Sequence, residues 1–126
     1  MTMIHKHLQS NQNIHELGIN YVIDLLDRVG FTIHDVNKDP GHHFQLFTAV
    51  NDKALLIAVR TAWHPDAGVI DNATRDKLIK ESEQRDAVPH FAGISLTSMN
   101  RNDIQVDKIP KGGEYKVIFN GMTVVR

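Results

Sequence analysis

The sequence predicts one domain of the α+β (α/β) class, in which a central mixed sheet is flanked by helices. Three observations indicate this class: a helical repeat of apolar residues over 13–29, an unbroken apolar run over 54–59, and a charge-rich helical segment between this run and further strand patterns. An apolar run without alternation is typical of a strand covered on both faces of a sheet. The predicted order is therefore a helix, three strands, a helix and two or three strands.

The first helix is predicted over 13–29, where Asn13 can cap its start and Gly30 can take the left-handed conformation that ends it. Its apolar residues recur at intervals of three and four, namely Ile14, Leu17, Tyr21, Val22, Leu25, Leu26 and Val29. A short strand follows over 31–36, and the turn-forming residues of 37–41 close it.

Two strands over 43–50 and 54–61 are predicted to pair antiparallel, because the polar residues 51–53 make a tight hairpin connection. After a loop over 63–68, Asp71 or Asn72 is expected to cap a second helix that reaches about Ala87 and is ended by Pro89. This helix is rich in charge and has few apolar residues, so we expect most of it to be exposed.

The C-terminal third shows two further strand patterns. Residues 90–97 form a predicted strand with Ala92, Ile94 and Leu96 on one face. Asn120-Gly121 separates alternating residues over 115–119 from a second run over 122–125. Because this dipeptide suits the positive φ angles of a two-residue turn, we predict a hairpin there.

The composition does not indicate a strongly charged partner surface. The chain has 126 residues, with 14 lysines and arginines against 15 acidic residues, a formal net charge of −1 and no cysteine. Disulfides, thiolate catalysis and cysteine zinc sites are therefore excluded. No apolar run approaches the ~20 residues of a membrane span.

We expect a single domain over 13–126, a cytoplasmic location and no membrane partner. Residues 1–12 are expected to form a flexible leader, or a short extension that packs through Ile4 and Leu8.

The segment from Gly18 to Thr61 resembles part of a nuclease family. It reads Gly-Ile-Asn-Tyr-Val-Ile-Asp-Leu-Leu-Asp-Arg-Val-Gly-Phe over 18–31 and continues into a hairpin that finishes in Ala58-Val59-Arg60. This pattern resembles the PD-(D/E)XK, or restriction-endonuclease-like, superfamily, and within it the YraN group of Holliday-junction-resolvase-like proteins. As architecture, the likeness spans roughly residues 13–97.

The resemblance implies a degenerate active site. In that family a helix glutamate, a strand aspartate and a Glu-x-Lys on the next strand hold a divalent metal, and the corresponding positions here are Ile19, Gln45, Ala58 and Arg60. Hard divalent cations require carboxylate oxygens, which these residues lack. Arg60 keeps a positive charge, but it cannot act as a base because its pKa stays above ~12. The resemblance therefore implies the fold without a catalytic residue, a metal or a cofactor.

A binding cleft at the end of the hairpin is the expected functional site. The candidate lining residues are Arg60, Gln45, Trp63, His43 and His64. Arg60 can either clamp a phosphate or carboxylate through two hydrogen bonds, or form a structural ion pair with Asp39 or Glu16. Trp63 can either stack on a base or plug an edge of the core.

Two metal-site hypotheses are less favoured by the residue pattern. His42 and His43 are adjacent, and neighbouring residues on a strand point to opposite faces, so they would rarely share an ion. A rebuilt nuclease centre would have to use acids outside the expected positions, namely Glu16, Asp35, Asp39 and Asp66. Solvated surface acids are the simpler interpretation of these four.

The leading functional hypothesis is a catalytically inactive nuclease-like domain that acts as a binding module for nucleic acid or protein. Because the net charge is close to zero, any binding to nucleic acid is expected to be weak and to decline with salt. Two rivals remain: an active metal-dependent nuclease with relocated acidic residues, and an unrelated α+β homo-oligomer with a small-molecule pocket. A homodimer is compatible with each of these hypotheses.

Overall fold

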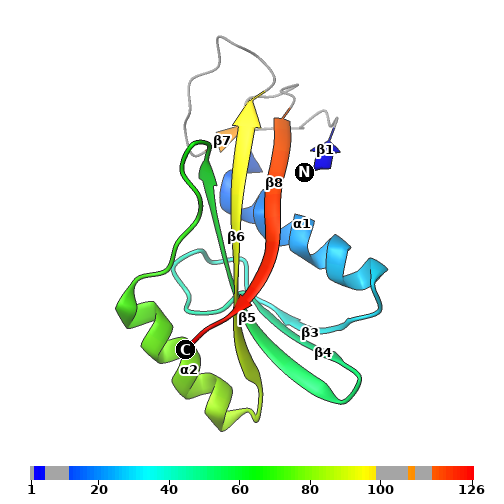
Figure 1. Cartoon of the computed structure of the whole chain (residues 1–126), viewed down its shortest axis with the longest axis vertical. Coiled ribbons are helices and arrows are strands. Elements are labelled where there is room, and N and C mark those ends of the chain that lie inside the picture. Colours follow the sequence, from blue (N-terminus) through cyan, green and yellow to red (C-terminus); the bar gives the residue numbers. More distant parts are fainter. Residues whose placement is uncertain (1, 5–11, 99–107, 110–114) are drawn as a thin grey trace.

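A mixed sheet runs through the computed structural model, which describes residues 2–4, 12–98, 108–109 and 115–126 (Figure 1). Its six strands lie in the order β1-β8-β6-β5-β4-β3. They are β1 (Thr2–Ile4), β3 (Thr32–Val36), β4 (Leu46–Val50), β5 (Lys53–Trp63), β6 (Val88–Ser98) and β8 (Tyr115–Val124). The central strands β5 and β6 are parallel, and every other neighbouring pair is antiparallel. The domain therefore has the α+β class and the mixed sheet that the sequence predicts.

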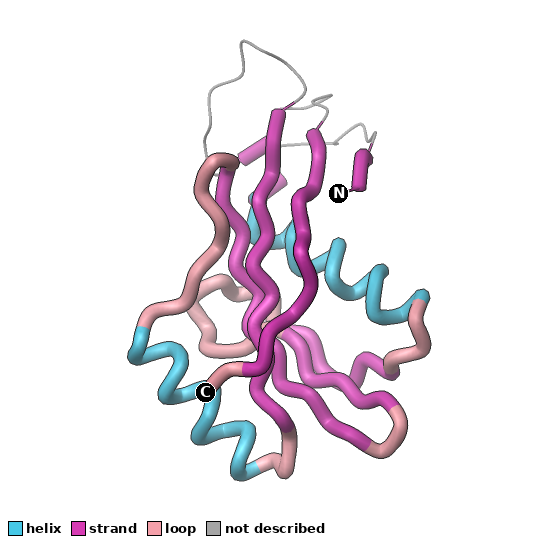
Figure 2. The backbone as a smooth tube through the Cα atoms, viewed as in Figure 1, coloured by secondary structure: helices cyan, strands magenta, loops and turns pink. Residues whose placement is uncertain are grey.

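Two helices cover opposite faces of this sheet (Figure 2): α1 (Ile14–Arg28) and α2 (Asn72–Gln84). Buried side chains of α1 pack with Ile57 and Val59 of β5, whereas Leu78 of α2 packs with Leu56 and Ala58. Alternate residues of a strand point to opposite faces, so one strand supplies both cores. This arrangement explains the apolar run over 54–59, and it confirms that β5 is a central strand.

The hairpin between β4 and β5 is also confirmed. Val50 pairs with Lys53, and the two residues between them, Asn51 and Asp52, have φ angles of 49° and 64°. Both angles are positive, as a two-residue turn between twisted strands requires. The chain enters β4 only at Leu46, so residues 43–45, predicted as the start of this strand, form a loop instead.

Helix α1 lies unusually close to β5 at Gly18. A Cβ atom on this residue would stand 1.9 Å from Oγ1 of Thr61, so glycine lets the helix lie directly against the Thr61 side chain, and a larger residue would require that side chain to shift. The helix ends at Arg28, and Gly30 has a φ of +97°, as expected for a glycine that terminates a helix.

The expected leader contains structure at both of its ends. Thr2–Ile4 form β1, which pairs antiparallel with β8, because the outer edge of β8 offers backbone groups for pairing. Gln12–Asn13 form β2, which pairs with β7 (Lys108–Ile109) in a separate two-stranded sheet. Asn13, the predicted N-cap, is the last residue of β2 and directly precedes α1, and Leu8 lies outside the described residues.

Helix α2 begins as predicted but ends earlier. The Oδ1 atom of Asp71 accepts a hydrogen bond of 2.7 Å from the backbone N–H of Thr74, which makes Asp71 the N-cap. The helix stops at Gln84, and Asp86 follows with a φ of 54°. Pro89 does not end the helix; it lies in β6, opposite Leu56. The left-handed residue reverses the chain before the proline is reached.

The predicted hairpin at Asn120-Gly121 is wrong. Residues 115–124 form one continuous strand, and the dipeptide is a bulge in it: Phe119 pairs with Ile94 and Met122 pairs with Ala92, so two residues oppose one. Of the two residues only Gly121 has a positive φ, +98°, whereas the type I′ turn that Asn-Gly favours requires positive φ at both positions. Asn120-Gly121 therefore forms a bulge and not a turn, because β8 remains paired with β6 both before and after this dipeptide.

Candidate functional site

The side-chain amide of Gln45 is the centre of the candidate site, and it is 0% exposed. Its Oε1 atom accepts hydrogen bonds from the backbone N–H of Val59 at 2.7 Å and from Nη1 of Arg60 at 2.9 Å. Its Nε2 atom donates to the carbonyl oxygens of Asp39 at 3.0 Å and His42 at 2.8 Å. Both amide donors and both lone pairs are thus used, which is the full capacity of a glutamine side chain.

The position of Gln45 immediately before the start of β4 explains this network. Its backbone N–H still donates to the carbonyl of Ile57 at 2.9 Å, but residues 43–45 form a loop, and the strand begins only at Leu46. Beyond this point β4 supplies no backbone partner for Val59 of β5. The amide of Gln45 takes that role, because a buried backbone N–H without a partner is costly.

Arg60 extends the same network toward the surface. Its Nη1 also donates to the carbonyl of Val59, and its Nη2 donates to the carbonyl of His42, both at 3.0 Å. These acceptors are neutral, so Arg60 ties the loop before β4 to β5 without a direct ion pair in these bonds. Burial lowers the pKa of Arg60, and the negative charges of Asp71 and Asp39 partly oppose this effect. Glu16, the other expected partner of Arg60, instead lies 3.5 Å from Lys38.

The loop before β4 is also held by α2. The Nε2 atom of His43 donates to Oε1 of Glu81 at 2.5 Å, and Arg85 approaches the other carboxylate oxygen at 2.7 Å. The His42 and His43 rings stack with centroids 4.3 Å apart. The guanidinium of Arg85 lies over the rings of Phe44 and Phe47, at 5.0 and 4.9 Å from their centroids. This histidine–glutamate–arginine contact therefore fastens the loop to the helix.

The carboxyl group of Glu81 gives this contact a pH dependence. Burial alone would raise its pKa, but the hydrogen bonds from His43 and Arg85 outweigh burial, and the pKa lies below the ordinary value of 4.5. A carboxyl group whose pKa is depressed in the folded state stabilises that state above its unfolded pKa. This stabilisation is lost as the pH falls through the depressed value.

We therefore expect Glu81→Gln to lower the free energy of unfolding by about 1 kcal/mol at pH 7, since it removes charge-assisted hydrogen bonds that are partly exposed to solvent. The difference from wild type should shrink as the pH falls below about 4.5. Urea unfolding from pH 7 to pH 3 measures this difference. Glu83→Gln, at an exposed position two residues along the same helix, is the matched control. An equal pH dependence in both variants would contradict this account of Glu81.

The remaining two cleft candidates lie elsewhere. Trp63 is partly buried against the core on the α1 face of the sheet, whereas Arg60 follows Leu56 and Ala58 on the α2 face. His64 is exposed, and its backbone N–H donates to the carbonyl of Leu96 at 2.7 Å. The structure thus brings Gln45, Arg60 and the loop of His43 together, and it places Trp63 on the other side of the sheet.

The positions that the nuclease resemblance assigns to metal ligands are also divided between the two faces. Ile19 is fully buried in the α1 core, and Ala58 is fully buried in the α2 core. In the parts of the chain that the structure describes, no three histidine, aspartate or glutamate side chains gather closely enough to hold a metal ion.

Sequence reasoning missed the residues of α2 that contact the site. Glu81 is 38 positions away from His43, and Arg85 follows it by one helical turn. Their spacing signals only an exposed helix with pairs at i and i+4. No local pattern indicates that the carboxylate of Glu81, besides pairing with Arg85, also contacts a histidine of a distant loop.

Fold and site together define a small α+β domain with a two-faced mixed sheet and a buried amide–guanidinium network at the end of its central hairpin. Residues 12–125 match the family described as Domain of unknown function (DUF8840), and the chain belongs to this family. No curated protein matches the sequence. Within the described residues, no helix has the length and apolar character needed to cross a membrane.

Proposed function

We propose that this chain is a restriction-endonuclease-like domain that has lost metal-dependent catalysis and works as a binding module. The order of its elements supports the proposed ancestry: α1, three strands that pair antiparallel in succession, α2, and then β6 parallel to β5. The two helices on opposite faces of the sheet agree with the central mixed sheet that the resemblance implies.

The observation that carries the loss of catalysis is the network of Gln45. At this position the resemblance expects an aspartate that binds a metal, but here the side chain donates to two backbone carbonyl oxygens. A carboxylate would direct a lone pair instead of an N–H group at these oxygens, which is unfavourable. The surroundings of residue 45 are thus built for an amide and support a structural role in place of metal binding.

The same geometry favours a protein as the partner over a nucleic acid. Arg60 uses three of its hydrogen bonds on Gln45, Val59 and His42 within the domain. The negative charges of Asp71 and Asp39 act on its guanidinium, and they would repel a phosphate. The chain as a whole has a net charge of −1, so no general attraction to a phosphate backbone compensates.

The first test is a cleavage assay with Mg²⁺ or Mn²⁺ on single-stranded, duplex and branched DNA. We expect no metal-dependent cleavage, because residues 19, 45 and 58 carry no carboxylate. Metal-dependent turnover that is abolished by Glu16→Gln or Asp39→Asn would instead establish the rival nuclease with relocated acids.

The second test distinguishes the two kinds of partner. Fluorescence anisotropy with labelled duplex DNA should show no binding by the wild-type protein at about 150 mM salt, where exposed charges are strongly screened. Arg60→Ala should lower the melting temperature, because it removes bonds that hold the loop. If the wild-type protein binds DNA and Arg60→Ala loses this binding at an unchanged melting temperature, the partner is a nucleic acid and not a protein. For a protein partner, candidates found by crosslinking must bind the purified chain saturably in titration calorimetry.

A further inference from the structure

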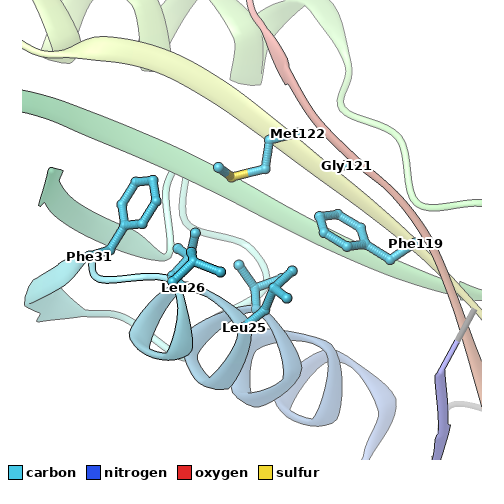
Figure 3. A pocket seen from close by; sticks show the side chains of 8 residues that line it. Leu25, Leu26, Phe31, Phe119, Gly121 and Met122 are labelled. Atoms are coloured by element: carbon cyan, nitrogen blue, oxygen red, sulfur yellow. The ribbon is translucent and has the colours of Figure 1, made fainter.

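An apolar hollow lies between the C-terminal half of α1 and the end of β8 (Figure 3). Its volume is about 290 Å³. The lining residues are Val22, Leu25, Leu26, Val29, Phe31, Phe119, Gly121 and Met122. The side chains of Leu25 and Leu26 on the helix face those of Phe119 and Met122 on the strand.

The bulge in β8 helps to keep this hollow open. Gly121 has no side chain, and a Cβ atom built on it would have no neighbouring atom within 4 Å. The positive φ of the bulge favours glycine at this position, so the space is retained by the backbone conformation. On one side the hollow is bounded by Phe119, whose ring packs edge-on against Tyr21 with centroids 5.9 Å apart.

The chemistry of the lining selects a neutral apolar occupant. Every side chain that lines the hollow is aliphatic, aromatic or a thioether. A charged or strongly polar ligand would lose its hydration here without gaining hydrogen bonds from a side chain, which is costly. Val22 and Leu26 are buried at the base, whereas Val29 is 61% exposed. An apolar ligand would therefore cover surface that is now open to water.

The size of the hollow selects a small molecule over a second protein. The lining consists of eight residues, whereas a stable protein interface uses roughly 20 to 30 residues on each side. A cavity of ~150 Å³ holds benzene, and ligand pockets generally begin near ~300 Å³. The observed volume thus matches an aromatic molecule of two or three rings or a short hydrocarbon chain.

We propose that this hollow is a binding site for a neutral, apolar small molecule. The site lies on the α1 face of the sheet, opposite the face that carries Ala58 and Arg60, so it stands independently of the proposed binding function. Its ligand is held by apolar contacts to α1 and β8.

The test uses two fluorescent probes that share a ring framework. N-phenyl-1-naphthylamine is neutral, and 8-anilinonaphthalene-1-sulfonate carries an additional sulfonate. We expect the neutral probe to bind wild type saturably at one site per chain and the sulfonate to bind at least about tenfold more weakly, because its charge has no partner in the lining. Equal affinities, or binding that does not saturate, would overturn the proposal.

Two variants assign the binding to the hollow. Leu25→Gln places an amide among the lining side chains, and Met122→Trp reduces the empty volume, so each should weaken the neutral probe about tenfold or more. Val69→Gln is the matched control, because Val69 is an exposed valine outside the hollow, and its probe affinity should be unchanged. Circular dichroism and thermal unfolding test whether each variant is folded. The conclusion is drawn from Leu25→Gln or Met122→Trp, whichever of the two is folded. Wild-type affinity in a folded lining variant would overturn the proposal.

Light scattering distinguishes the remaining occupant, a second copy of this chain. The proposal expects the same mass for wild type and Leu25→Gln, with or without the neutral probe. A wild-type dimer that becomes monomeric in Leu25→Gln would show that the hollow is a contact between copies, and it would overturn the ligand site.

Discussion

Replacing Gln45 with leucine is expected to lower the free energy of unfolding by about 3 kcal/mol or more. Leucine has a similar size but makes none of the four hydrogen bonds of the amide. The backbone N–H of Val59 would lose its partner in the interior, and the carbonyl oxygens of Asp39 and His42 would each lose a donor. Leaving the N–H of Val59 unpaired costs about 1–3 kcal/mol. The two carbonyl oxygens keep other donors, namely the backbone N–H of His42 and the guanidinium of Arg60, so each lost bond to them adds about 0.5–1.5 kcal/mol.

Urea unfolding monitored by circular dichroism measures this effect, and Gln84→Leu is its matched control. Gln84 is an exposed residue at the end of α2, so its replacement should change stability by no more than about 0.5 kcal/mol. Gln45→Glu adds a third comparison: it retains an acceptor for Val59 but removes both donors, so it should also destabilise the domain. A Gln45→Leu protein as stable as the control would show that this network is dispensable.

Gly68→Ala is expected to destabilise the domain by about 3 kcal/mol, because the loop after β5 lies directly on the backbone of that strand. A Cβ atom at residue 68 would stand 2.0 Å from the carbonyl oxygen of Arg60 and 2.2 Å from its carbonyl carbon. Backbone atoms cannot rotate away as a flexible side chain can, so the loop or the strand would have to move. The hydrogen bond of 3.3 Å from Gly68 to the carbonyl of Ile94 would be disturbed with them.

Gly41→Ala is the matched control for this effect. Gly41 lies in an exposed turn, and the atom nearest to a Cβ there is Oδ1 of Asp39, at 3.3 Å. We expect its unfolding free energy to change by well under 1 kcal/mol, since a surface side chain can adjust. If both alanine variants unfold at the same urea concentration as wild type, the close approach of Gly68 to Arg60 has no energetic importance.

The elements that could be predicted from the sequence are those whose signal is local. The period of apolar residues in α1, the apolar run of β5 and the alternation of Ala92, Ile94 and Leu96 each follow from side-chain direction within one element. The turn at Asn51-Asp52 was also predictable, because its two residues tolerate positive φ angles. The α+β class follows from these elements together.

The residues of the candidate site were only partly predictable. The nuclease resemblance drew attention to Gln45 and Arg60, which do contact each other. It could not separate the two faces of the sheet, on which Trp63 and Arg60 lie, since the pairing of the strands determines which alternate residues face α1 or α2.

The amino-acid sequence by itself determined where the helices and the central hairpin lie, because each depends on residues a few positions apart. Only the tertiary structure decided what three of these features do. Asn120-Gly121 became a bulge because β6 runs alongside β8 through it. Glu81 reached His43 because α2 packs on the face to which the loop before β4 returns. Gln45 became a structural amide because β4 begins only at Leu46, and the side chain of Gln45 supplies the acceptor that the backbone N–H of Val59 requires.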